Sequence, residues 1–474
     1  MKKALALLGS TALLSASAGM ACATSDDEAR PSTDDGGTTV LTDAGGDANP
    51  TPDATPPVVP TCSSAGWCRT TLPDGDLDLR DIWAFASRAF AIAESPTLGV
   101  KVLEWDEATR AWSYIDDDTQ NGFELDAYAG KIWAPNENEV YFASGPGLVY
   151  HGNRATPGAA WSWKRTQLED TSPNRAPDRE PGRIDYYDQY WNSRDATALG
   201  VWGTSADDVY AWYGGTIFHL ESAGGGADKV PVPVHVLEDA ETPADSFFVF
   251  GASGSGPDDV WFAAGRARFD WNVFRCPMVL HKTASGFARL VDNVIDEADV
   301  GSHYYDTCRE KKDVLGFRWH SGKDMFHWTN GGWMTNIESA GPGRAAGIVG
   351  ERLFAYVESG TPGTARVNVV AAQVPRDSPP TLVNAVWING ADTWISGWGL
   401  VLRAPTDPTR WSSGLGLYTQ DDAKQLLIDA PTYAFSPTSI NGAPLDRPLH
   451  QVRGTSNENL WAIGLQHALH KTTP

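Results

Sequence analysis

A short repeated pattern is the feature of this sequence that most restricts its fold. The clearest copy, VWGTSADDVYAWYGGTIFHL, occupies residues 201–220, and the alternating segment VPVPVHV follows at 230–236. A Ser-Ala-Asp-Asp turn and a Gly-Gly turn separate three apolar runs, so the unit predicts three antiparallel strands and then a fourth. Four short strands per unit, with a Trp on the first or second strand, are typical of a β-propeller blade.

Degenerate copies occur along most of the chain. Their first strands are marked by Trp83, Trp133, Trp202, Phe250, Trp387 and Arg453. The 137 residues between Phe250 and Trp387 leave room for two more units, one ending in DMFHWTNGGW (324–333) and one opening with GIVGERLFAYV from Gly347. We therefore expect an all-β propeller of eight four-stranded blades, or of seven if one of these two weak units is an excursion.

The two ends of the repeat region complement each other. The last copy stops after its third strand, at residues 468–471, whereas residues 67–72 look like a fourth strand with no blade of its own and compare with residues 163–168. Pairing these two segments would remove the open edge of a linear array. We expect an N-terminal strand to complete the last blade.

The repeats resemble those of bacterial, especially myxobacterial-type, exported β-propeller proteins, whose units read roughly WGSSxxDVWAVGxxGTILHxDGxxW. The resemblance covers residues 61–474. It implies a propeller fold, but little about function, because propellers serve many functions.

The first residues have the layout of a secretory signal peptide. Lys2 and Lys3 precede an apolar run at 4–18, which is too short for a stable membrane span. The run ends at Gly-Met-Ala-Cys22, which resembles the lipobox of bacterial lipoproteins apart from Gly19, where that family usually has Leu. We expect residues 1–21 to be removed and Cys22 to be lipidated; ordinary cleavage to a soluble secreted protein is the alternative.

Residues 22–60 are expected to form a disordered tether behind this anchor. Between 24 and 60 there are eight acidic residues, six prolines, one basic residue (Arg30) and no aromatic residue, so the segment cannot bury a core. The expected location is the envelope of a Gram-negative bacterium, at the outer membrane or cell surface, with membrane contact only through the lipid. The net charge of −23 argues against binding of nucleic acid or of an anionic lipid surface.

Four cysteines remain if Cys22 carries lipid, and none has the CxxC spacing of a zinc or redox site. In an exported chain we expect two disulfides among Cys62, Cys68, Cys276 and Cys308, with four unpaired thiols as the alternative. Propeller topology places Cys276 and Cys308 on one face, so we expect them to be bonded to each other.

Several residues that invite a chemical role have simpler explanations. Trp83, Trp133, Trp202 and Trp387 share one repeat position, and Trp67, Trp112, Trp163, Trp333 and Trp411 share another, so most are expected to pack blades. His151, His219, His281, His327 and His470 each close a third strand and diverge from blade to blade, so they cannot share a metal ion. The acidic stretch 116–122 is expected to be a solvated turn. A calcium loop starting at Asp117 is the alternative, but Tyr128 occupies the position of the bidentate Glu. We expect no metal and no cofactor.

Aromatic residues in three insertions fit no repeat position. We expect a binding rim for a glycan or protein partner on one propeller face, formed by Tyr186, Tyr187, Asp188, Trp191, Trp271, Tyr304, Tyr305 and Asp306. The alternative is that these loops only pack on one another as a lid.

The sequence contains no GxSxG, HExxH, Walker or dinucleotide motif. We therefore expect a monomeric binding or scaffold propeller without catalytic residues. The rival is a hydrolase or lyase acting on envelope or extracellular polysaccharide, with paired carboxylates over the central channel.

Overall fold

The computed structural model divides the chain into two compact units, Met1–Val58 and Val59–Pro474, and every described residue belongs to the second. The described residues are 62–121, 127–175, 180–188, 192–222, 229–269, 273–295, 308–320, 326–328, 332–350, 353–360, 365–371, 383–390, 392–405, 434–439, 445 and 447–473. In these ranges the chain is almost entirely β, and one 3₁₀ turn, η1 (Thr119–Asn121), is the sole helical element. They contain no helix that is long and apolar enough to cross a membrane.

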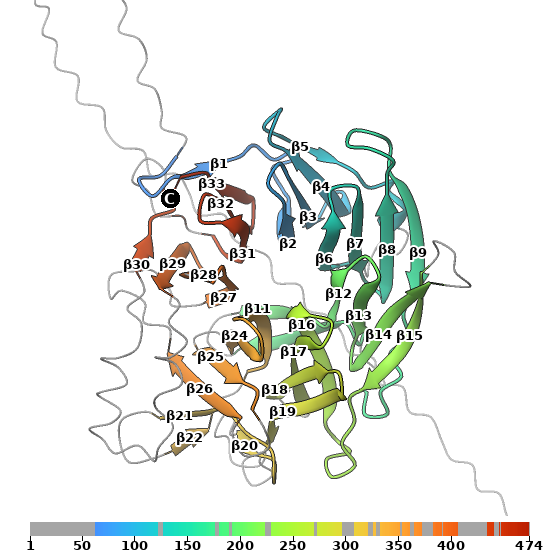
Figure 1. Cartoon of the computed structure of the whole chain (residues 1–474), viewed down its shortest axis with the longest axis vertical. Coiled ribbons are helices and arrows are strands. Elements are labelled where there is room, and N and C mark those ends of the chain that lie inside the picture. The colour runs from blue at the N-terminus through green and yellow to red at the C-terminus, as the bar shows by residue number, and fades with distance from the viewer. Residues whose placement is uncertain are drawn as a thin grey trace, which may run out of the picture. The chain divides into compact units, whose positions relative to one another are not determined.

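Seven antiparallel sheets surround a common axis, and in the first six of them the innermost strand comes first in the chain (Figure 1). The first blade consists of β2 (Asp78–Ala84), β3 (Arg88–Ser95), β4 (Gly99–Asp106) and β5 (Ala111–Tyr114). The second consists of β6 (Ala129–Asn136), β7 (Glu139–Ser144), β8 (Leu148–Asn153) and β9 (Ser162–Gln167). The third consists of β12 (Leu199–Ser205), β13 (Asp208–Tyr213), β14 (Thr216–Ser222) and β15 (Lys229–Val236). The fourth blade has five strands, β16 (Ser246–Gly256), β17 (Asp259–Phe269), β18 (Val273–Thr283), β19 (Gly286–Ile295) and β20 (Cys308–Glu310).

The last three blades follow the same order. The fifth blade consists of β23 (Met334–Ser339), β24 (Arg344–Val349), β25 (Leu353–Glu358) and β26 (Arg366–Ala371). The sixth consists of β27 (Val383–Ile388), β28 (Asp392–Gly397), β29 (Leu400–Pro405) and β30 (Ala434–Ser436). The last consists of β31 (Leu449–Ser456), β32 (Asn459–Gly464) and β33 (His467–Lys471) with β1 (Trp67–Arg69). Two hairpins lie in connections between blades: β10 (Arg183–Asp188) with β11 (Asn192–Thr197), and β21 (Arg318–His320) with β22 (Phe326–Trp328).

The expected count of eight blades is wrong, and the alternative of seven is confirmed. Residues 324–333 do not end a blade, because β22 pairs only with β21 in a two-stranded sheet. His327 accordingly lies in this hairpin rather than on a third blade strand, and Trp333 precedes an innermost strand rather than standing on a fourth one. The segment from Gly347 belongs to β24 and β25, which are the second and third strands of the fifth blade.

The predicted closure of the ring is confirmed. β1 pairs with β33, with Trp67 opposite Lys471 and Arg69 opposite Leu469. The Trp67 side chain is fully buried, donates its indole N–H to Ser436 Oγ at 2.9 Å and makes an edge contact with Trp394 of the neighbouring blade. The first ordered segment of the propeller thus holds its last blade in place.

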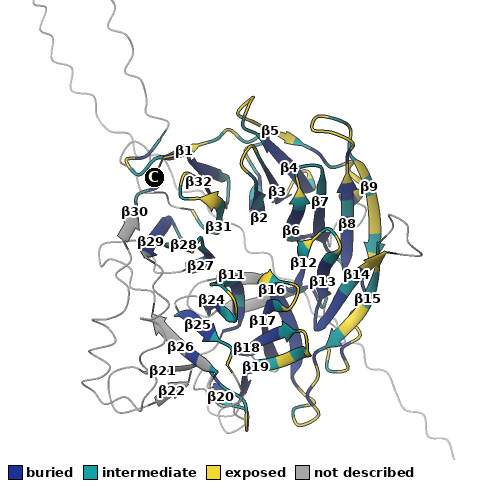
Figure 2. Ribbon diagram, viewed as in Figure 1, coloured by how far each residue is buried: buried dark blue, intermediate teal, exposed yellow. Residues whose placement is uncertain are grey.

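Burial is concentrated on the inner strands, while the outer strands β9 and β15 are mostly exposed or half-buried (Figure 2). The largest apolar cluster runs between the second, third and fourth blades and includes Trp133, Trp212 and Phe262. The apolar faces of neighbouring blades therefore stabilise one another.

Third-strand histidines fasten individual blades. In the fourth blade, His281 Nε2 lies 2.8 Å from Asp259, and its ring stacks on Trp261 with centroids 3.9 Å apart. Ser255 in turn bonds Asp259 at 2.5 Å. The equivalent histidines contact an acid or amide in the same way: His151 with Glu139, His219 with Asp208 and His470 with Asn459. The repeated spacing of these residues is thus explained by packing.

Candidate functional site

The insertions noted in the sequence leave the propeller on one face. In each blade the hairpin between the second and third strands and the connection after the fourth strand lie at the same ends of the strands. We call this side the insertion face and define it by residues 180–197, 237–245, 266–276 and 295–308. The described parts of these segments show how each insertion is fixed at its base.

The first insertion is fixed by Glu180. Its carboxylate accepts hydrogen bonds from the Tyr128 hydroxyl at 2.7 Å and the Tyr213 hydroxyl at 2.8 Å. Burial and the Glu180 charge raise the pKa of both phenols well above their usual value, so both remain neutral donors. Because Glu180 lies three residues before the β10–β11 hairpin, it ties the start of that hairpin to the second and third blades.

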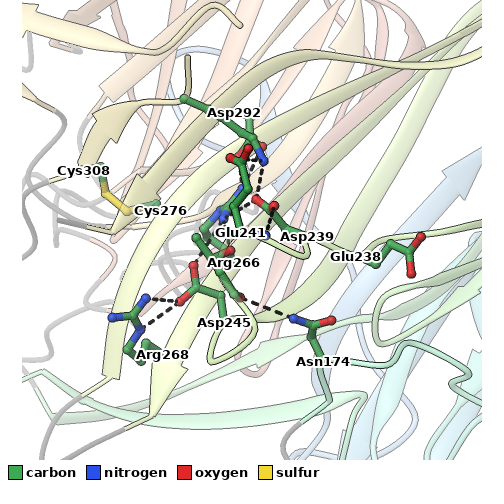
Figure 3. A network of polar contacts seen from close by, with 12 residues as sticks. Asn174, Glu238, Asp239, Glu241, Asp245, Arg266, Arg268, Cys276, Asp292 and Cys308 are labelled. Atoms are coloured by element: carbon green, nitrogen blue, oxygen red, sulfur yellow. Dashed lines mark hydrogen bonds and ion pairs between the residues drawn. A yellow bond between two sulfur atoms is a disulfide. The ribbon is translucent and has the colours of Figure 1, made fainter. Parts of the chain in front are cut away.

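The second insertion is fixed by a buried network around Arg266 (Figure 3). The guanidinium is fully buried on β17 and contacts Asp292 at 2.6 Å, with Asp239 and Asp245 each at 3.2 Å. Further cations surround these carboxylates: Lys311 lies 2.5 Å from Asp239, Arg268 lies 2.8 Å from Asp245, and Arg289 lies 3.3 Å from Asp292. The network therefore joins the connection 237–245 to β17, to β19 and to Lys311, the residue that follows β20.

The surrounding charges favour the ionised forms of Asp239 and Arg266. Burial alone would raise the pKa of Asp239, but Lys311, the Glu241 amide and Arg266 outweigh it and lower that pKa to about 2. Burial likewise opposes the charge on Arg266, yet Asp292 and Asp245 raise the pKa of the guanidinium. A charge group that is buried and mutually paired in this way holds one geometry, because displacing one partner leaves the others uncompensated.

A disulfide lies directly beside the network. Cys276 is opposite Arg266 in the β17–β18 register and is bonded to Cys308, with Cα atoms 5.7 Å apart. This confirms the expected pairing, and Cys62–Cys68 confirms the second disulfide. Trp333 packs on the same region, where its indole donates to the Arg266 carbonyl at 2.9 Å. The hairpin around 269–273 and the segment that ends at Cys308 are therefore fixed to each other at their bases.

The predicted rim residues belong to these insertions in the sequence. Tyr186, Tyr187 and Asp188 are on β10, where their backbones pair with residues 192–194; their side chains are not described. The remaining ones lie outside the described residues: Trp191, Trp271, Tyr304, Tyr305, Asp306 and the expected lipidation site Cys22. The rim stays a prediction, as does lipidation.

The sequence did not predict which residues fix the insertions. Arg266 alternates with apolar residues on β17 and reads as one more outward-facing side chain, while Asp239 and Asp245 read as polar loop residues. The sequence does contain a pattern that could have indicated a charge network. Three acidic residues, Asp239, Glu241 and Asp245, lie in one connection. Two arginines, Arg266 and Arg268, follow where an insertion begins. Their convergence needs the pairing of β17, β18 and β19, which the sequence does not specify.

Polar side chains on the innermost strands link neighbouring blades: Asp81 accepts from the Ile132 amide at 3.0 Å and from Gln451 at 3.0 Å, and Asn336 accepts from the Val386 amide at 3.0 Å. The cavity among these strands measures about 20 Å³, enough for about one water molecule.

One pair of carboxylates does occur at the channel. Burial raises the pKa of Glu338, and the nearby Asp81 charge adds to this, although Arg453, 3.3 Å from Glu338, acts in the opposite direction. A carboxyl with a raised pKa close to a second carboxylate is the arrangement that a glycosidase would use. A sugar ring does not fit into the 20 Å³ cavity itself.

The acidic stretch near Asp117 is engaged with protein groups. Asp117 accepts hydrogen bonds from Thr119 and Gln120, and both Asp116 and Asp118 are ion-paired with Lys101. Across the described ranges, no group of three or more His, Cys, Asp or Glu side chains is placed to hold a metal ion.

No known protein family and no curated protein matches the chain. Among solved structures, YCF48 bound to D1 peptide is similar at 10% identity, with 88% of this chain and 98% of that chain covered and a TM-score of 0.47. YCF48 from Cyanidioschyzon merolae (11% identity, 86% and 98%, TM-score 0.44) and the WD40 beta propeller domain of Doa1 (10% identity, 85% and 96%, TM-score 0.44) are also similar. Similarity at this level gives no information about function.

Proposed function

We propose that the chain is an exported, lipid-anchored β-propeller that binds a glycan or protein partner through the insertion face. The observation that carries the proposal is the reinforcement of this face. A hydrogen-bonded carboxylate, a buried charge network and a disulfide fix the bases of three insertions, and the aromatic residues of the predicted rim belong to the same insertions in the sequence. Loops held in this way lose little conformational entropy when a partner binds.

Binding is supported by the composition of the predicted rim. Tyr and Trp with neighbouring Asp supply contact area and hydrogen bonds, a combination common in binding surfaces. The envelope location rests on the signal-like residues 1–21, Cys22 and the acidic tether.

Partner binding is tested with a triple variant, Trp271→Ala, Tyr304→Ala and Tyr305→Ala, on a glycan array and in pull-downs confirmed with the purified partner. We expect wild type to bind, the triple variant to lose at least about tenfold in affinity, and its thermal unfolding to stay close to wild type. Trp161→Ala, at the opposite ends of the strands, is the control and should bind normally. Full binding by a well-folded triple variant would contradict the proposal.

The anchor is tested by cell fractionation. Cys22→Ser should move the protein from the membrane fraction to a soluble fraction. Unchanged membrane association, with no lipid mass on the N-terminal peptide, would show that the proposed anchor is absent.

A further inference from the structure

A groove between the second and third blades stands apart from the insertion face. It encloses about 340 Å³, which falls within the 300–1,000 Å³ of common small-molecule sites. Its lining includes His151 on β8, Lys164 on β9 and Lys229 on β15. Asn153 and Ser162 flank the β8–β9 hairpin, and Lys229 opens β15, so the groove lies toward the ends of the strands opposite to the insertions.

The charge of the groove differs from that of the molecule. The chain has 60 acidic and 37 basic residues, yet the described residues that line the groove include Lys164 and Lys229 and no acidic residue. Arg165 also lines it, but its side chain interacts with the Tyr150 hydroxyl on the other face of the sheet. Asp207 lies 3.8 Å from the Lys229 ammonium, but its side chain is 99% exposed, so this ion pair is weak. A cationic hollow in an acidic protein attracts an anion locally, although the whole surface repels one.

The register of β8 and β9 places the Lys164 and His151 side chains on the face of the sheet that lines the groove. Lys164 is opposite His151 in the β8–β9 pairing, and residues directly opposite each other project from the same face of a sheet. His151 is itself fixed, because its Nε2 lies 3.0 Å from Glu139 and its ring stacks on Tyr141 with centroids 4.2 Å apart.

Apolar and neutral polar groups complete the lining. Val149 and Leu220 provide apolar surface, and Thr166 provides a hydroxyl. Apolar walls with a few placed polar groups are typical of sites for small organic ligands.

We propose that this groove binds a small ligand, the size of one or two sugar rings, that carries an oxyanion: a carboxylate, sulfate or phosphate. Lys164 and Lys229 approach the oxyanion from the second and third blades respectively, and the apolar wall contacts the rest of the ligand. The site is separate from the insertion face, so it holds whether or not the proposed partner binds there.

The proposal is tested by calorimetric titration of the full-length chain with digalacturonate, its neutral methyl ester and inorganic phosphate. We expect saturable binding of digalacturonate, of phosphate or of both, and none of the ester. Digalacturonate alone would indicate an acidic sugar as the ligand, and phosphate alone a phosphorylated one. Raising the salt concentration should weaken the binding.

Two variants locate the site. Lys229→Gln should weaken binding of the same probe about tenfold or more, because a charged hydrogen-bond donor is lost. Lys282→Gln is the matched control: this lysine of the fourth blade is paired with Asp258 and lies outside the groove lining. It should bind as wild type does, as should the triple variant of the rim, which separates this proposal from the proposed function. The proposal is overturned if neither anion binds up to about 10 mM, if the ester binds as well as the acid, or if Lys229→Gln binds normally.

Discussion

At the scale of single residues, Arg266 shows how much one side chain can organise. It is fully buried and joins carboxylates from two different segments, the connection 237–245 and β19. Arginine suits this position because its planar guanidinium donates several hydrogen bonds in fixed directions.

Arg266→Met should lower the free energy of unfolding by about 3 to 5 kcal/mol, because three buried carboxylates would lose a shared partner. Equilibrium unfolding in urea measures this. Arg80→Met is the control, since the Arg80 ion pairs are partly exposed; it should cost about 1 kcal/mol or less. Equal losses in the free energy of unfolding for the two substitutions would show that burial does not make the Arg266 network more important for stability than a partly exposed ion pair.

A second prediction at this scale concerns pH. His470 is buried in the last blade, where burial lowers its pKa to about 4; Glu107 opposes this shift and Arg110 adds to it. Since its unfolded pKa is about 6.5, the unfolded chain binds more protons than the folded one between these values. The contribution of His470 is therefore fully present above pH 6.5 and is lost as the pH falls toward 4.

His470→Phe keeps a ring against Trp461 but cannot bind a proton. The free energy of unfolding of wild type minus that of this variant should decrease as the pH is lowered from 7 to 4, as measured by urea unfolding at each pH. A constant difference across this range would contradict the assigned pKa.

At the scale of elements, strands were more predictable than their partners. The unit at 201–220 predicted β12, β13 and β14, because alternation, turn residues and apolar runs are local signals. DMFHWTNGGW misled because its Phe-His-Trp order imitates the end of a blade, whereas its pairing with β21 is decided by a segment outside the pattern. The bases of the insertions could not be predicted for the same reason: their side chains converge only after the strands have paired.

The Cys276–Cys308 disulfide belongs to this scale, because it links β18 to β20 and closes a loop across 32 residues of sequence separation. Replacing both cysteines by Ser should cost about 3 to 4 kcal/mol in the chain-entropy model. The segment 269–308 should also exchange its amide hydrogens faster, as hydrogen exchange with mass spectrometry would measure. Unchanged exchange there would mean that the Arg266 network alone fixes the insertion.

At the scale of the whole molecule, seven blades form one ring that depends on a strand from the start of the repeat region. The sequence predicted this closure because an incomplete last unit and an unassigned first strand have only each other as partners. It did not predict the number of blades, since insertions within and between blades lengthen the chain as much as an added blade would.

Relocating the closing strand tests the ring most directly. Three chains are compared by equilibrium unfolding: residues 62–474, residues 73–474, and residues 73–474 followed by 62–72. Because Trp67 lies opposite Lys471, the third chain can join β33 to β1 by a short hairpin. It should unfold within about 1 kcal/mol of the first, whereas the second should lose at least about 3 to 5 kcal/mol with the buried Trp67 and the uncovered edge. A second chain as stable as the first, or a third as unstable as the second, would contradict closure of the ring by β1.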